Sequence, residues 1–304
     1  MRRITHPLYV AGVALAFGAG AGAQSPPRTL DVDSARINYT LTGSGPAVVL
    51  LHGWALNLRE WADQIPPLSS RYTVIAVDRR GFGKSTGFAD ETADPGDIRA
   101  LLDSLHVKSA TLLGHSAGAA VAMRFAAAMP DRVDALVLYG GPPPAGFPGE
   151  FVPPPGLSPM QRIARASGVD SALRTLESRP QFRPGPRRTP QAAARVDSIV
   201  KSYSGRDLLE DHAPSNRFAM ATMSTVRSWR FPILYISGEW EAPGWHRMAD
   251  SVAAWLPSAR HVTIPGGGHG VHFDEPEAFN AAVVSFLNSV QRAAPVKPSG
   301  VRIP

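Results

Sequence analysis

The sequence predicts an α/β fold, in which helices cover both faces of a mostly parallel central sheet. Short, continuously apolar runs are typical of strands buried on both faces, and they alternate along the chain with stretches of helical periodicity. This alternation favours parallel strands joined by helical crossovers. In addition, a Pro- and Arg-rich stretch without a strong strand signal predicts a helical insertion in the fold.

Residues 1–23 are predicted to be a secretory signal peptide. Arg2 and Arg3 supply positive charge, residues 8–18 are apolar, and residues 21–23 are small enough for cleavage. The alternative is an uncleaved membrane anchor, which the shortness and the Gly and Ala content of the apolar stretch disfavour. We therefore expect an exported protein, periplasmic or secreted, with no stable membrane insertion after cleavage.

Residues 24–140 are predicted to form the first part of the core, beginning with a polar tether at 24–34. Strands are expected at 36–41, 47–51, 72–77, 110–113 and 133–139. Helices are expected at 57–65, where Pro66 and Pro67 would close the helix, at 97–105, and in the Ala-rich stretch 119–128.

Residues 141–215, which we call the cap segment, are predicted to be a helical insertion rich in proline and arginine. The second part of the core is predicted at 216–292, with strands at 232–236 and 261–264 and helices at 245–255 and 277–291. Residues 293–304 are expected to be a flexible tail.

Composition excludes several kinds of chemistry. The 304 residues include no cysteine, so disulfides, thiol catalysis and zinc–thiolate sites are excluded. The net charge is +6, but no basic run is interleaved with aromatic residues, and we expect no nucleic-acid partner. Gly83-Lys84-Ser85 lacks the upstream spacing of a phosphate-binding loop, and a dinucleotide fingerprint is missing. We therefore expect neither a cofactor nor a metal.

One pentapeptide, residues 114–118, carries the candidate nucleophile. Its sequence is Gly-His-Ser-Ala-Gly, and it joins a predicted strand to the Ala-rich helix, so Ser116 would be held out on a sharp turn. A side chain at either glycine would collide with the neighbouring strand or helix when the turn closes this tightly. Because sites in such sheets gather at the carboxyl ends of strands, partners are expected there too.

A serine hydroxyl needs a base to take its proton and a carboxylate to orient that base. His269 is the predicted base, since it follows three glycines after the last strand. His272 is the competitor, expected instead to pack against the last helix. The acid is expected on the loop after the 232–236 strand, where Glu239 and Glu241 lie. Asp250 is also near in sequence but falls within a helix, on its expected solvated face.

The reaction also needs donors for the oxyanion that forms on the attacked carbonyl. We predict that these are the backbone N–H groups of Trp54 and Ala117. His52 and His115 are expected to be structural, one orienting the oxyanion loop and the other inside the turn. Residues 78–85 are expected to be a supporting loop ordered by Asp–Arg pairing.

These motifs resemble those of the α/β-hydrolase fold superfamily, from about Ile37 to Val290. The matching stretches are residues 48–54, 78–85, 114–118 and 268–269, followed by 275–280. Nucleophile, acid and histidine also come in that family's order. In such proteins the acid usually ends a Gly-Glu-x-Asp string; residues 238–241 match it with glutamate in place of aspartate, so the resemblance implies Glu241. It also implies a helical cap at the position of the cap segment.

A serine at this position argues against epoxide opening and halide removal, for which relatives use aspartate. We predict a serine hydrolase that cleaves a small carboxylic ester or lactone through an acyl-enzyme intermediate. The alternatives are a C–C bond hydrolase or acyltransferase using the same residues, an exported peptidase, and a ligand-binding protein with vestigial catalysis. The aromatic residues of the cap segment favour an apolar acyl or aromatic substrate: Phe147, Phe151, Phe182 and Tyr203. An anionic substrate attracted by its arginines is the alternative.

Overall fold

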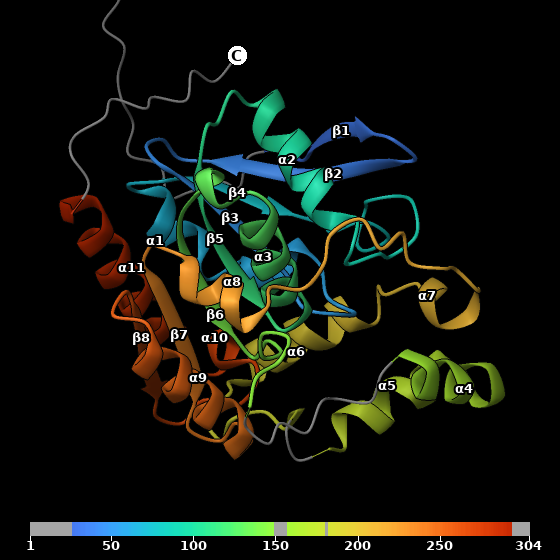
Figure 1. Cartoon of the computed structure of the whole chain (residues 1–304). Coiled ribbons are helices and arrows are strands. Elements are labelled where there is room, and N and C mark those ends of the chain that lie inside the picture. Colours follow the sequence, from blue (N-terminus) through green and yellow to red (C-terminus); the bar gives the residue numbers. More distant parts are fainter. Residues whose placement is uncertain (1–25, 149–156, 180–181, 294–304) are drawn as a thin grey trace, which may run out of the picture.

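The computed structural model describes residues 26–148, 157–179 and 182–293 (Figure 1). The predicted signal peptide and all but the first residue of the predicted tail lie outside these ranges. None of the helices in these ranges combines the length and the apolar character needed to cross a membrane.

Eight strands form one sheet in the order β1-β2-β4-β3-β5-β6-β7-β8. The strands are β1 Arg28–Val32, β2 Ala35–Thr42, β3 Ala47–Leu51, β4 Thr73–Val77, β5 Ala110–His115, β6 Val133–Tyr139, β7 Ile233–Gly238 and β8 Ala259–Ile264. Neighbouring strands in the series β4-β3-β5-β6-β7-β8 pair in parallel, whereas β2 pairs antiparallel with both β1 and β4. The predicted mostly parallel sheet is confirmed.

Helices lie on both faces of this sheet. They are η1 Leu58–Trp61, α1 Ile65–Ser69, α2 Asp94–Ser104, α3 Ala117–Ala128, η2 Pro130–Arg132, α4 Leu157–Ser167, α5 Val169–Glu177, α6 Pro190–Val200, α7 Arg206–Leu209, α8 Met223–Ser228, α9 Pro243–Trp255, α10 Val271–Asp274 and α11 Pro276–Ala293. Alternate strand residues face opposite layers: Val49 and Leu51 pack with α2, α3 and α9, whereas Val48 and Leu50 pack with α1 and α11. This double burial explains the continuously apolar strands.

Two predicted elements are wrong at the start of the core. Residues 28–32 are not part of a tether but form β1, an edge strand whose five residues all pair with β2. Pro66 and Pro67 do not end a helix. They lie in the first turn of α1, where the missing N–H of proline costs no helical hydrogen bond, and the expected helix at 57–65 is reduced to the 3₁₀ turn η1.

The described part of the cap segment contains α4 to α7 and no named strand. Helices α4 and α5 lie apart from the helices that cover the sheet, at the lower right of Figure 1. A small apolar cluster holds the segment together: Met160, Ala164, Ala172 and Leu208. Trp54, from the loop after β3, packs against this cluster, so the segment reaches the carboxyl end of the sheet.

Candidate active site

Ser116 lies at the junction of β5 and α3 with a strained backbone, φ 52° and ψ −116°. Its N–H donates to the carbonyl of Tyr139 at 2.9 Å, which fixes the turn to β6. A Cβ on Gly114 would lie 2.5 Å from the carbonyl oxygen of Gly118, and one on Gly118 would lie 2.0 Å from that of Leu51. Both glycines are therefore needed for α3 to approach β5 and β3, as the sequence predicts.

His269 and Glu241 are brought together from the loops that follow β8 and β7. His269 Nδ1 lies 2.9 Å from Glu241 Oε1, and both side chains are buried. Glu239 instead accepts a hydrogen bond from the N–H of Gly266 at 2.9 Å and so holds a turn. Asp250, on α9, pairs with His261 at 2.6 Å. Of the three candidate acids, Glu241 is the one that contacts His269.

The surroundings of His269 favour a neutral imidazole. Phe182 of the cap segment meets the ring edge-on with 4.8 Å between centroids, and Trp245 does so at 5.5 Å. Burial lowers the pKa of His269, and the hydrogen bond and charge of Glu241 oppose this shift. Nε2 is buried and has no hydrogen-bond partner within the described part of the chain. A neutral ring held through Nδ1 leaves Nε2 able to accept a proton.

The two predicted oxyanion donors lie at the start of α3 and in the loop after β3, where the sequence places them. Ala117 is the first residue of α3, so its N–H has no carbonyl partner within the helix. Trp54 follows β3 and precedes Ala55, which has a strained positive φ of 60°. His52 braces this loop, with Nδ1 2.7 Å from the carbonyl of Gly53 and Nε2 accepting from the N–H of Arg79 at 2.9 Å.

The supporting loop at 78–85 is held by Asp–Arg ion pairs, as expected, but its arginines pair with aspartates of the next helix and not with Asp78 of the loop itself. Arg79 pairs with Asp94 at 2.9 Å and Arg80 with Asp97 at 2.6 Å, both on α2. Asp78 instead accepts hydrogen bonds from backbone N–H groups, including that of Leu58 at 2.7 Å. The loop thus connects α2 to the segment after β3.

A cavity of about 900 Å³ joins these residues to the cap segment. Trp54, Ser116, Ala117 and His269 all line it. The cap segment contributes apolar side chains to the lining as well: Met160, Leu176, Phe182, Val196 and Val200. Of the four aromatic residues predicted to favour an apolar substrate, Phe182 lines the cavity, whereas Phe147 packs on Trp255 and Phe151 lies outside the described residues. Tyr203 stands behind the lining, edge-on to Trp54.

Residues 46–276 match a known family, described as the alpha/beta hydrolase fold. The chain belongs to this family. An uncharacterized protein of Mycobacterium tuberculosis is 40% identical to this hydrolase over 84% of the chain and 79% of its own length. A pimeloyl-[acyl-carrier protein] methyl ester esterase of Cronobacter sakazakii is 30% identical over 81% and 95%. The structure of an enol-lactonase from Burkholderia xenovorans superposes with a TM-score of 0.69, at 22% identity, over 86% of this chain and all of its own.

The described lining of the cavity of this hydrolase carries both arginines and carboxylates. Three arginines belong to this described lining, and each is engaged: Arg79 with Asp94 at 2.9 Å, Arg188 with Asp274 at 2.6 Å, and Arg124 with a backbone carbonyl at 2.8 Å. The lining also includes five carboxylates: Asp90, Glu91, Glu177, Asp197 and Asp207. The described lining therefore gives no support to the alternative of an anionic substrate.

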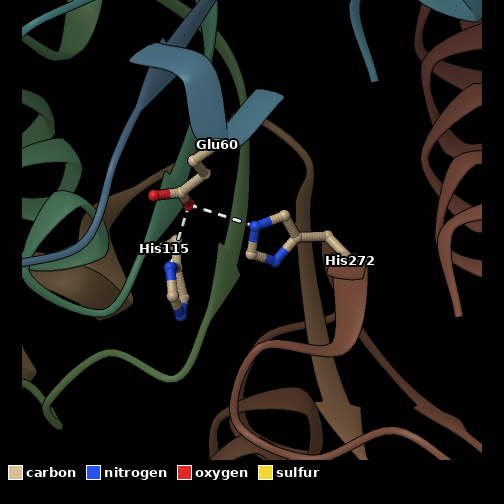
Figure 2. Close-up of side chains that lie close together, drawn as sticks. All are labelled: Glu60, His115 and His272. Atoms are coloured by element: carbon tan, nitrogen blue, oxygen red, sulfur yellow. Dashed lines mark hydrogen bonds and ion pairs between the residues drawn. The ribbon is translucent and has the colours of Figure 1, made fainter. Parts of the chain in front are cut away.

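A second cluster of titratable side chains lies beside His269. Figure 2 shows Glu60, from η1, between His115 and His272, and all three are buried. One ligand atom of each lies within 4.8 Å of the others, and two imidazoles with a carboxylate are donors that a divalent cation accepts. Glu60 Oε1 is also at hydrogen-bond distance, 2.9 Å, from His115 Nδ1. The donor types thus allow either a metal or a hydrogen-bonded cluster.

Sequence reasoning missed Glu60, Asp207 and Trp245 at this site. Asp207 accepts the indole N–H of Trp54 at 2.7 Å, and Trp245 lies against His269. Trp245 could have been suspected from its place just after the acid, at the start of a predicted helix. Glu60 and Asp207 carry no such signal, because a charged residue in a polar stretch ordinarily predicts a solvated surface.

Proposed function

We propose that the protein is a serine hydrolase that cleaves a small carboxylic ester or lactone through an acyl-enzyme on Ser116. One observation carries the proposal. Ser116, on its strained turn, lines the same cavity as His269, whose Nδ1 is bonded to Glu241 at 2.9 Å and whose buried Nε2 has no partner among the described residues. A nucleophile and a base thus line one cavity, and the base is bonded to the group that orients it.

The chemistry follows from these roles. His269 Nε2 takes the hydroxyl proton of Ser116 as its oxygen attacks the acyl carbonyl, and later gives that proton to the departing alcohol. Glu241 keeps the other proton on Nδ1, so that Nε2 is the basic nitrogen. The N–H groups of Trp54 and Ala117 stabilise the oxyanion, where one donor is worth on the order of 10²–10³ in rate. Water then releases the acid by the same steps.

The form of the cavity supports an apolar acyl group or an aromatic substrate. The cap segment contributes several aliphatic side chains and Phe182 to the lining, beside the carboxylates of Glu177, Asp197 and Asp207, and the lining residues Arg79 and Arg188 are held in ion pairs. The ester-cleaving relative from Cronobacter sakazakii, similar over most of both chains, supports a carboxylic ester as the bond cleaved. We also propose that residues 1–23 direct export, so that the enzyme meets its substrate outside the cytoplasm.

The proposal is tested with Ser116→Ala and a fluorophosphonate probe. Wild type should hydrolyse p-nitrophenyl esters, with a preference along a C2 to C12 acyl series, and should gain one probe adduct. Ser116→Ala should lose both reactions. Ser237→Ala is the matched control, because Ser237 is buried at the end of β7 but bonds to His261 at 3.0 Å; it should keep both. Hydrolysis that persists in Ser116→Ala would refute the proposal. Turnover of substrates with a cleavable C–C bond, without turnover of esters, would favour the alternative of a C–C bond hydrolase.

A further inference from the structure

Glu60 is a buried carboxylate that takes no part in the chemistry proposed above. It lies in η1, and only 1% of its surface is exposed. Oε2 accepts the N–H of Gly53 at 3.1 Å, and Oε1 lies 2.9 Å from His115 Nδ1, at hydrogen-bond distance. Oε1 also lies 3.3 Å from His272 Nε2, a contact without hydrogen-bond geometry (Figure 2). The two oxygens thus meet three nitrogens of other segments.

Each of these nitrogens belongs to a segment that carries one part of the proposed machinery. Gly53 directly precedes Trp54, the proposed oxyanion donor. His115 directly precedes Ser116, and His272 follows His269 by three residues. We propose that Glu60 is a positioning residue that holds the oxyanion loop, the serine turn and the histidine loop in register, so that they act as one site. This inference rests on the proposed function.

The packing around Glu60 leaves these segments little room to find another arrangement. Tyr139 stacks on the His115 ring at 4.8 Å, and Trp61 lies against the His272 ring at 5.3 Å. A Cβ on Gly53 would lie 2.9 Å from His115 Nδ1, so the oxyanion loop and the serine turn are already in close contact. Without an acceptor at Glu60, the buried Gly53 N–H would lose its partner, and the loop would shift to recover one.

The hydrogen-bonded cluster is favoured over a metal at the same three residues. Glu60 Oε2 is already committed to Gly53, and Oε1 to His115, in bonds of ordinary length. The rings of Trp61, Tyr139, Phe273 and Phe279 pack around His272, so most of the surface that meets its imidazole is aromatic. Binding of a cation is therefore an outcome that the test must be able to detect.

Two substitutions separate positioning from simple packing. Glu60→Gln keeps an oxygen for Gly53 and gains an N–H that can donate to His115, so it should retain activity within about 3-fold. Glu60→Met has a similar volume and no acceptor, and should lower kcat by about 10–100-fold, because a misplacement of about 1 Å in a site can cost 10²-fold. KM should change by less than about 3-fold, since the cavity wall that binds the acyl group is intact.

Binding of a tetrahedral boronate reports the oxyanion loop directly. A butaneboronic acid that adds to Ser116 places its oxygen where the oxyanion forms. Its affinity for Glu60→Met should fall in parallel with kcat, about 10–100-fold, and recover in Glu60→Gln. Gln64→Met is the matched control: Gln64 is equally buried and donates to the carbonyl of His272 at 3.2 Å, but no bond joins it to Gly53 or His115. It should keep kcat and boronate affinity within about 3-fold.

The outcomes are distinct. Unchanged kcat and boronate affinity in a folded Glu60→Met, or equal losses in Gln64→Met, would overturn the positioning role while leaving wild-type hydrolysis intact. The positioning role would also be overturned if the wild type bound one equivalent of Zn²⁺ or Co²⁺ tightly and both Glu60 variants lost it. If Glu60→Met fails to fold, loss of kcat and boronate affinity in a folded Glu60→Gln would overturn it. A wild type that neither cleaves esters nor labels with fluorophosphonate would refute the proposed function, and this role with it.

Discussion

Replacing Gly140 with alanine should displace His269. Gly140 directly follows β6 and has a positive φ of 61°; a Cβ placed there would lie 2.6 Å from His269 Cε1 and 3.0 Å from Nδ1. Ordinary contacts begin at 3.4 Å, so the ring or the backbone must give way by roughly 0.8 Å. A misplacement of about 1 Å can cost about 10²-fold in rate, and we expect kcat/KM to fall by about 30–100-fold.

Backbone strain must be separated from this collision. An alanine in the left-handed region costs about 1–2 kcal/mol wherever it occurs, which lowers the melting temperature by a few degrees. Gly146→Ala supplies the comparison: its φ is 77°, but a Cβ there has nothing within 4 Å. Both variants should melt a few degrees below wild type, whereas only Gly140→Ala should lose activity on p-nitrophenyl butyrate. Equal activity losses, or wild-type activity in Gly140→Ala, would refute the reasoning.

Three further predictions concern charge. Since burial lowers the pKa of His269 and the neutral ring is the base, kcat/KM should be flat at neutral pH and fall on acidification with a midpoint below 6.5; a midpoint above 6.5 in the pH–rate profile would contradict this. Glu241→Gln should lower kcat by on the order of 10³–10⁴, as loss of the orienting carboxylate does in such triads, while Glu239→Gln stays within a few fold; the reverse order would reassign the acid. Because carboxylates outnumber arginines among the described residues of the cavity lining, an ester with a terminal carboxylate on its acyl chain should be cleaved about 10-fold less efficiently than its neutral methyl-capped analogue. Equal kcat/KM values for the two esters would refute this.

Those parts of the fold that depend on local pattern could be predicted from the sequence. The continuous apolar runs marked the central strands because both faces of the sheet are covered. The glycines of the pentapeptide marked the sharp turn because backbone atoms approach them closely. In contrast, β1 could not be predicted because an edge strand with one exposed side has only a weak apolar pattern. The start of α1 could not be predicted either, because the pair Pro66 and Pro67 can follow the end of one helix or lie in the first turn of the next.

The candidate active site likewise contains residues that local sequence patterns mark and residues that they do not. Ser116, His269 and Glu241 could be predicted because motifs and loop positions mark them, although the choice of Glu241 over Glu239 required the resemblance to a family. Glu60 could not be predicted from the sequence, since its proposed role depends on contacts with three segments that are distant in sequence and meet only in the folded chain. Burial of a single carboxylate is a property of tertiary packing, which local periodicity does not encode.

The central claim is that Ser116 becomes acylated during turnover. Wild type mixed with a slowly deacylating p-nitrophenyl ester and quenched in acid within milliseconds should gain the mass of one acyl group, and peptide mapping should place it on Ser116. The adduct should disappear as the substrate is exhausted, and Ser116→Ala should never form it. Steady hydrolysis without any acyl adduct, or an adduct on another residue, would contradict the proposed mechanism.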